Sequence, residues 1–127
     1  MFDSFEREIN YLRISVTDKC NLRCRYCMPE EGVPLRSHGD FLSFETIAEV
    51  VRVGVGLGLT KVRLTGGEPL VKRGIVELVR LLRPIEGLKH LAMTTNGTLL
   101  DRYARPLREA GLDSLNISLD TLDGDWY

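Results

Sequence analysis

The order of strand-like and helix-like patterns limits the fold of this chain more than any other feature of its sequence. Four short segments read as strands, and helical patterns separate them. Apolar and polar residues alternate in the first and the fourth of these segments, as Leu12 and Ile14 do around Arg13. Strands joined through helices form right-handed βαβ units in a parallel sheet. The sequence therefore predicts an α/β fold with strands at Tyr11–Val16, Lys61–Thr65, Leu88–Thr94 and Ser114–Ser118.

The helical patterns carry their own start and stop signals. Ser43 is placed to cap a first helix that ends near Gly56, because serine favours the N-cap and glycine ends many helices. The second and third helices are predicted over Gly74–Arg83 and Leu99–Ala110. Pro106 falls inside the third helix and is expected to kink or split it, whereas Gly111 is placed to cap its end.

The only three cysteines, Cys20, Cys24 and Cys27, lie within eight residues in the spacing C-x-x-x-C-x-x-C. They fall in a long loop, Thr17–Asp40, without periodicity of its own, and such loops are usually functional or disordered. Three thiolates this close together can converge on one inorganic centre, and iron–sulfur clusters are held by cysteine thiolates. A 4Fe–4S cluster on three cysteines keeps one iron free for a small molecule, so the pattern indicates chemistry at a metal centre.

The cysteines alone leave other interpretations open. They could be buried small residues, although Asn21, Arg23 and Arg25 make the loop polar. One disulfide with one free thiol would need an oxidising compartment and suitable geometry. A structural Cys3His zinc site, completed by His38, is the stronger competitor on spacing.

Every unusual stretch of the chain follows the end of a predicted strand. The cysteine loop follows the first strand, Gly66–Pro69 follows the second, Thr94–Gly97 the third, and Ser118–Asp120 ends the fourth. In parallel sheets with crossover helices, ligands bind at the carboxyl ends of the strands. We therefore expect these four segments to meet at one edge of the sheet and form a binding site there.

Composition and charge argue against several classes of function. The chain has 127 residues, of which 43% are hydrophobic and 28% charged, with a net charge of −1. These values fit a globular domain. The net charge gives no sign of the basic surface that a nucleic-acid-binding protein needs. Residues 1–10 contain no apolar signal segment, and the most apolar run, at 50–59, is too short to span a bilayer. Unpaired cysteines without an export signal predict a cytoplasmic protein with no membrane partner.

Taken together, the motifs resemble those of the radical S-adenosylmethionine (SAM) enzymes. The first is the cysteine motif with Tyr26 before its third cysteine, and the second is Gly66-Gly67-Glu68-Pro69, one strand later. Within that superfamily, the chain most resembles the GTP 3′,8-cyclase family, from about Tyr11 to Leu122. The segments that carry the resemblance are Leu12–Cys24, Tyr26–Pro29, Val62–Leu70, Thr94–Gly97 and Asn116–Asp120.

The resemblance implies a partial TIM-type (βα)6 barrel, of which this chain would form the first half. It implies that Cys20, Cys24 and Cys27 hold three irons of a 4Fe–4S cluster, whose fourth iron binds SAM. An electron from the cluster would cleave SAM to methionine and a 5′-deoxyadenosyl radical. The SAM contacts that the resemblance implies are Tyr26, Gly67, Glu68 and Ser118.

Each implied SAM contact has a plainer alternative. Gly66 and Gly67 are expected to leave room for a ligand beside the backbone, and Glu68 to accept a hydrogen bond from the ammonium group of SAM. Without the cysteines, Gly66–Pro69 would be read as an ordinary turn. Tyr26 could shield the cluster from water, either in place of a SAM contact or in addition to it. Ser118 could be an ordinary polar residue of a strand.

By the same resemblance, Arg13, Arg63 and Thr94 contact GTP, the implied substrate. Arginine suits phosphate because its planar fork donates paired, charge-assisted hydrogen bonds. The alternative is a structural ion pair of either arginine with Glu68 or Asp120. The implied product is 3′,8-cyclo-7,8-dihydro-GTP, made in the first step of molybdenum-cofactor biosynthesis. The implied partners are an electron donor and, in a longer parent protein, a second copy of the chain.

This sequence departs from that family in length. The family's enzymes are longer and hold a second 4Fe–4S cluster on three further cysteines, whereas no cysteine follows Cys27 here. We therefore expect residues 1–127 to be the N-terminal part of a radical SAM core domain, with the second cluster only in the full-length parent. Two other functions stay open: a different radical SAM enzyme, such as a peptide-modifying one, and a non-catalytic metal-binding module.

Overall fold

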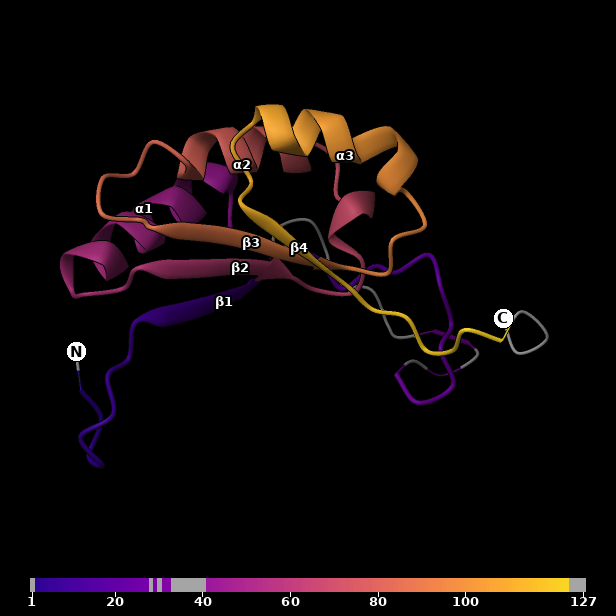
Figure 1. Cartoon of the computed structure of the whole chain (residues 1–127), viewed down its shortest axis with the longest axis horizontal. Helices are drawn as coiled ribbons and strands as arrows, with labels where there is room; N and C mark the ends of the chain where they lie inside the picture. The colour runs from indigo at the N-terminus through magenta and orange to yellow at the C-terminus, as the bar shows by residue number, and fades with distance from the viewer. Residues whose placement is uncertain (1, 28, 30, 33–40, 124–127) are drawn as a thin grey trace.

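The computed structural model describes residues 2–27, 29, 31–32 and 41–123, which form one sheet with helices on one side (Figure 1). The four strands are parallel and lie in the order β1-β2-β3-β4. Their bounds are β1 Tyr11–Ser15, β2 Lys61–Thr65, β3 His90–Thr95 and β4 Ser114–Ile117. The predicted α/β fold with a parallel sheet is therefore confirmed, and each predicted strand is found.

The helices follow the strands in the predicted alternation. They are α1 Phe44–Gly56, α2 Ile75–Leu82 and α3 Leu100–Glu109, with a short 3-10 helix, η2, at Pro69–Val71. Figure 1 shows α1, α2 and α3 along one face of the sheet, whereas no described helix covers the opposite face. This second face is called the uncovered face below.

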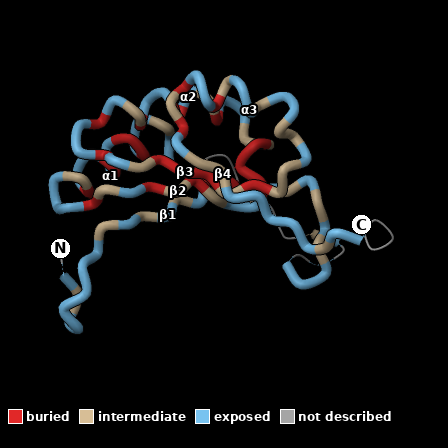
Figure 2. The backbone as a smooth tube through the Cα atoms, in the orientation of Figure 1, coloured by how far each residue is buried: buried red, intermediate tan, exposed pale blue. Residues whose placement is uncertain are grey.

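The core lies between the helices and the sheet, where Figure 2 shows most of the buried chain. Helix α2 contributes Ile75, Leu78 and Leu82 at helical spacing, each at most 1% exposed. Leu64 of β2 and Met93 of β3 meet them from the sheet and are fully buried. Each side chain of this size stabilises the fold by about 1.5–3 kcal/mol when it leaves water, so this layer fixes the position of the strands.

The helix ends largely follow the predicted signals. The Ser43 hydroxyl accepts a hydrogen bond from the Thr46 N–H at 3.1 Å, which confirms the N-cap of α1. Helix α3 runs without a break through Pro106, so the helix is not split there. Proline removes only one hydrogen bond here, and the helix is fixed by buried Leu107 and by Gly111, whose φ of 96° suits the cap.

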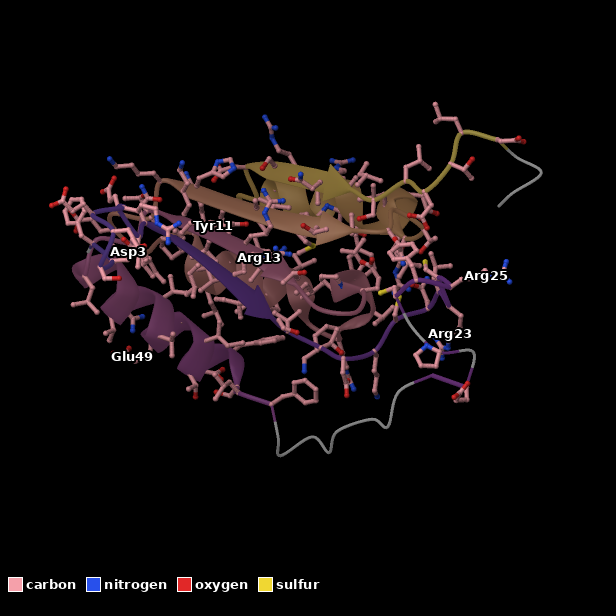
Figure 3. All side chains as sticks on the ribbon, turned by 90° about the horizontal axis from the view of Figure 1, so that it is seen from below. Asp3, Tyr11, Arg13, Arg23, Arg25 and Glu49 are labelled. Atoms are coloured by element: carbon pink, nitrogen blue, oxygen red, sulfur yellow. The ribbon has the colours of Figure 1, made fainter. Side chains whose placement is uncertain are left out.

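The register of the strands sets which side chains share the uncovered face. Arg13, Arg63, Ala92 and Ser114 are partners across the four strands, and residues two positions along each strand point the same way. Figure 3 views the molecule from this side, with Tyr11 and Arg13 labelled on β1. The other residues of this face include Lys61, His90, Thr94 and Asn116. The face is polar, as the alternation in the sequence predicts.

None of the helices in the described part of the chain is both long and apolar enough to cross a membrane.

Candidate functional site

The turn after β2 is joined to the start of the cysteine loop by main-chain hydrogen bonds. The Gly67 N–H donates to the Thr17 carbonyl and the Glu68 N–H donates to the Lys19 carbonyl, each at 2.8 Å. Lys19 directly precedes Cys20 in the sequence. The segments after β1 and β2 therefore meet at the carboxyl edge of the sheet, where the prediction placed the site.

Gly66 and Gly67 lie against the backbone of the cysteine loop. A Cβ on Gly66 would lie 2.4 Å from the Thr17 carbonyl oxygen, and one on Gly67 would lie 2.3 Å from that of Lys19. The backbone of the cysteine loop thus takes the space that a side chain at either position would need. These glycines allow the turn after β2 and the cysteine loop to pack closely. A contact between Gly67 and SAM stays a prediction.

Glu68 ties the turn after β2 to the turn after β3. Its side chain is buried, at 1% exposure. One carboxylate oxygen accepts hydrogen bonds from the Leu70 N–H at 2.9 Å and the Thr95 hydroxyl at 2.8 Å. The other accepts from the Asn96 N–H at 2.7 Å. Both oxygens of Glu68 therefore accept hydrogen bonds within the protein, and its predicted bond to the SAM ammonium group stays untested.

A ring of three side chains, which sequence reasoning missed, joins the cysteine loop to the turn after β3. The Asn96 amide donates to the Asn21 carbonyl oxygen at 2.9 Å, and the Asn21 amide donates to the Thr98 hydroxyl at 2.8 Å. The Thr98 hydroxyl closes the ring by donating to the Asn96 carbonyl oxygen at 2.7 Å. Asn96-Gly97 was a turn signal in the sequence, but no local pattern pairs it with Asn21.

The three cysteines lie on this loop as free thiols, with Cys20 and Cys24 half-buried and Cys27 exposed. The alternatives of a disulfide and of buried core cysteines are therefore wrong. Within the described residues, no three Cys, His, Asp or Glu side chains lie close enough to hold one metal ion. His38, the fourth zinc ligand considered above, lies outside the described residues.

A cluster places weaker demands on the separation of its thiols than a single ion does. A lone zinc ion needs all its ligands about 2 Å from one point, whereas each thiolate of a cluster binds a separate iron. Thiols that stand too far apart for one ion can therefore still hold a cluster. The donor set is also suitable, because thiolate sulfur is the usual ligand of such clusters.

Asp120, just beyond β4, connects the fourth strand to the cysteine loop. The Tyr26 hydroxyl donates to its carboxylate at 2.9 Å. This hydrogen bond and the negative charge of Asp120 raise the pKa of Tyr26. Partial burial, followed by the charge of Asp120, raises the pKa of the Cys24 thiol. Tyr26 is 77% exposed. Its predicted SAM contact and the alternative of a shield over the cluster both stay untested.

Arg13 and Arg63 lie side by side on the uncovered face, as register partners of β1 and β2. Within the described residues, neither arginine forms an ion pair. The alternative of a structural ion pair with Glu68 or Asp120 is therefore wrong. Both carboxylates lie at the carboxyl edge and are bonded to other groups there.

The Arg63 side chain extends across β3 to reach β4. Its guanidinium donates to the Tyr11 hydroxyl at 2.7 Å, to the Thr94 hydroxyl at 3.2 Å and to the Asn116 side-chain oxygen. Ala92, the β3 partner of Arg63, is only 1% exposed although its face has no helix over it. The small Ala92 side chain leaves room for this path, so Arg63 and Thr94 are brought together, and their predicted contact with GTP stays a prediction.

Ser118 continues the pairing of β4, because its N–H donates to the Thr95 carbonyl at 2.9 Å. Its side chain is exposed, and by strand alternation it shares the uncovered face with Thr94 and Asn116. The structure therefore places the cysteines, the Gly66–Pro69 turn and Asn96 together at the carboxyl edge. The predicted GTP contacts lie on the adjoining uncovered face.

Fold and site together define a class of protein: a parallel βα-repeat domain with a three-thiol loop at the carboxyl edge of its strands. The sequence also matches the family model of the radical SAM superfamily over residues 14–126. The chain belongs to the radical SAM superfamily, and its sheet is part of a radical SAM barrel.

Curated relatives match the whole length of this chain. It is 56% identical over 127 residues to the GTP 3′,8-cyclase of Alkaliphilus oremlandii, of which it covers 40%. It is 58% identical over 127 residues to the GTP 3′,8-cyclase of Moorella thermoacetica, of which it covers 39%. The chain therefore spans about 40% of the length of the curated relatives it matches.

Solved structures of other proteins share the fold. Streptococcus suis SuiB bound to precursor peptide SuiA matches with a TM-score of 0.71 at 21% identity, over 92% of this chain and 26% of that one. BtrN in complex with AdoMet and 2-DOIA matches with a TM-score of 0.64 at 20% identity, over 87% of this chain and 46% of that one. At these identities the likeness concerns the fold alone.

Proposed function

We propose that this chain is the SAM-cleaving part of a GTP 3′,8-cyclase. The observation that carries the proposal is a loop with three free thiols bonded to the turn after β2, at the edge where parallel sheets bind ligands. The identity of 50–58% with GTP 3′,8-cyclases supports the particular activity. The domain proposed is the N-terminal part of a radical SAM core.

In this proposal, Cys20, Cys24 and Cys27 hold a 4Fe–4S cluster. When bound, the cluster supplies the electron that cleaves SAM, and a separate electron donor then reduces the cluster again. The residues of the chain position and shelter these groups. We assign SAM binding to Tyr26, Gly67, Glu68 and Ser118, all of which lie at or next to the carboxyl edge.

The GTP contacts proposed are Arg13, Arg63 and Thr94. Two guanidinium groups without ion-pair partners in the described chain lie next to each other on the uncovered face. Unpaired cations that already point to one side suit a polyanionic ligand such as a triphosphate. The product would be 3′,8-cyclo-7,8-dihydro-GTP, a precursor of the molybdenum cofactor.

The first test is the metal content of the chain. After anaerobic reconstitution with iron and sulfide, we expect about four irons and four sulfides per chain, because the three thiolates complete one cluster. A variant with Cys20, Cys24 and Cys27 replaced by alanine is expected to keep neither and serves as the control. One zinc per chain without sulfide would contradict the proposal.

A second measurement separates this function from other radical SAM reactions. Formation of 5′-deoxyadenosine by the reconstituted chain is measured with and without GTP. A rise with GTP supports a cyclase-type site, because the substrate organises the cavity in which SAM is cleaved. No change with GTP, but a rise with a peptide substrate, would favour the peptide-modifying alternative.

Replacing Arg63, on β2, is expected to lower the affinity of the chain for GTP. Arg63→Ala is expected to weaken GTP binding about 10- to 100-fold, since charge-assisted hydrogen bonds are worth about 1.5–3 kcal/mol. Arg63→Lys is expected to restore only part of the affinity, because an ammonium lacks the planar fork. Calorimetric titration with GTP measures both, and Arg108→Ala, an exposed change on α3, is the control. Equal affinities in all the variants would exclude Arg63 from the GTP site.

A further inference from the structure

The side chain of Asn96 reaches the first cysteine of the loop. Its amide nitrogen lies 3.9 Å from the Cys20 sulfur, while one of its two hydrogens is already used in the bond to Asn21. The Leu22 N–H is a second donor near the same sulfur, at 3.4 Å. Cys20 therefore has two nitrogen donors within reach.

The orientation of the Asn96 amide is fixed by its other partners. Its carbonyl oxygen accepts from the Thr98 backbone N–H at 3.1 Å as well as from the Thr98 hydroxyl. A backbone N–H can only donate, so a flipped amide would place nitrogen against nitrogen there and oxygen against the sulfur. The NH2 group must therefore face Cys20.

The turn that carries Asn96 is itself held in place. The Asn96 backbone N–H donates to buried Glu68, and the ring through Asn21 and Thr98 is closed, with each side chain both donating and accepting. Closed networks of this kind hold each member in one orientation. The donor that faces the sulfur is thus preorganised by the protein.

We propose that Asn96 is a positioning residue for the cluster, which orients the Cys20 thiolate and raises the reduction potential of the cluster. The inference rests on the proposed cluster site. Hydrogen bonds to the sulfur ligands are among the factors that set the potential of an iron–sulfur cluster. A donor facing Cys20 stabilises the reduced cluster, because that state carries the additional negative charge.

Two changes at Asn96 separate this role from the structural role of the ring. Asn96→Asp keeps an oxygen for the Thr98 N–H but places a negatively charged oxygen next to the sulfur. Asn96→Ala removes the donor without adding charge. Thr98→Val is the matched control, because it opens the ring by removing the hydroxyl but leaves the Asn96 amide facing Cys20.

The experiment measures the midpoint potential of the reconstituted 127-residue chain by reductive titration, without SAM or GTP. We expect Asn96→Asp to make reduction roughly tenfold less favourable, a shift of about 59 mV to more negative potential for one electron. Asn96→Ala should shift the same way by less, and Thr98→Val should match the wild type.

Each other outcome counts against the inference. Equal potentials in all variants, or an equal shift in Thr98→Val, would show that the ring acts only structurally. If Asn96→Asp binds no cluster, the midpoint potential of Asn96→Ala is compared with that of the wild type instead. If neither Asn96→Ala nor Thr98→Val binds a cluster, the inference is also overturned. A wild-type chain without a cluster would instead overturn the proposed function, on which this inference depends.

Discussion

Gly67→Ala is expected to abolish stable cluster binding while the sheet stays folded. The new methyl group would lie 2.3 Å from the Lys19 carbonyl oxygen, 2.6 Å from its carbon and 2.9 Å from the Asp18 carbonyl oxygen. All three atoms belong to the backbone, so no side-chain rotation can relieve the clash. The loop must therefore move away from the turn after β2.

The expected size of this effect follows from the cost of overpacking. Such insertions typically cost about 1–3 kcal/mol, which lowers the ratio of docked to undocked loop roughly 5- to 150-fold. Docking also depends on the hydrogen bonds of Gly67 and Glu68 to Thr17 and Lys19, which the shift would lengthen. Since Lys19 adjoins Cys20, the first ligand would leave its position relative to the other two.

Iron and sulfide content after reconstitution measures the loss, and circular dichroism checks that the fold persists. Gly56→Ala, at the end of α1, is the control, because a Cβ there would meet no atom within 4 Å. A full complement of iron in Gly67→Ala would show that the cluster does not depend on contact between the loop and the turn.

The fold could be predicted from the sequence because it depends on local periodicity. The apolar positions of α2 and the alternation in β1 are visible in the sequence and are the positions that pack. The meeting of the cysteine loop with Gly66–Pro69 was also predictable, since the carboxyl ends of parallel strands lie at one edge. These conclusions require no knowledge of individual side-chain contacts.

The contacts within the site could not be predicted in the same way. What occupies the space beside Gly67 depends on the path of residues 17–19, which no local pattern encodes. The partners of Arg63 depend on the register of three strands and on the small size of Ala92. The ring of Asn21, Asn96 and Thr98 joins residues 75 and 77 positions apart in the sequence.

Glu68→Gln is expected to destabilise the fold even though the two side chains have nearly the same shape. The carboxylate accepts from Leu70, Thr95 and Asn96, so both of its oxygens face donors. An amide must turn its NH2 group either to the Asn96 N–H or to the Leu70 N–H. The N–H of buried Leu70 or of half-buried Asn96 then loses its acceptor, at a cost of about 1–3 kcal/mol.

Glu68→Ala removes all three acceptor contacts and should cost more, about 3–5 kcal/mol. Thermal unfolding measures both variants, with about 4 °C of lowered Tm expected for each kcal/mol in a domain of this size. Glu86→Gln, the same change at an exposed position, should leave Tm unchanged.

The two Glu68 variants also test how the carboxyl edge is assembled. Glu68 is the group that joins the turn after β2 to Asn96, so its loss should release Asn96 and lower cluster retention more than it lowers Tm. Iron loss over time, measured well below Tm, detects this difference. Retention equal to that of Glu86→Gln would mean that the turn after β3 is held without Glu68.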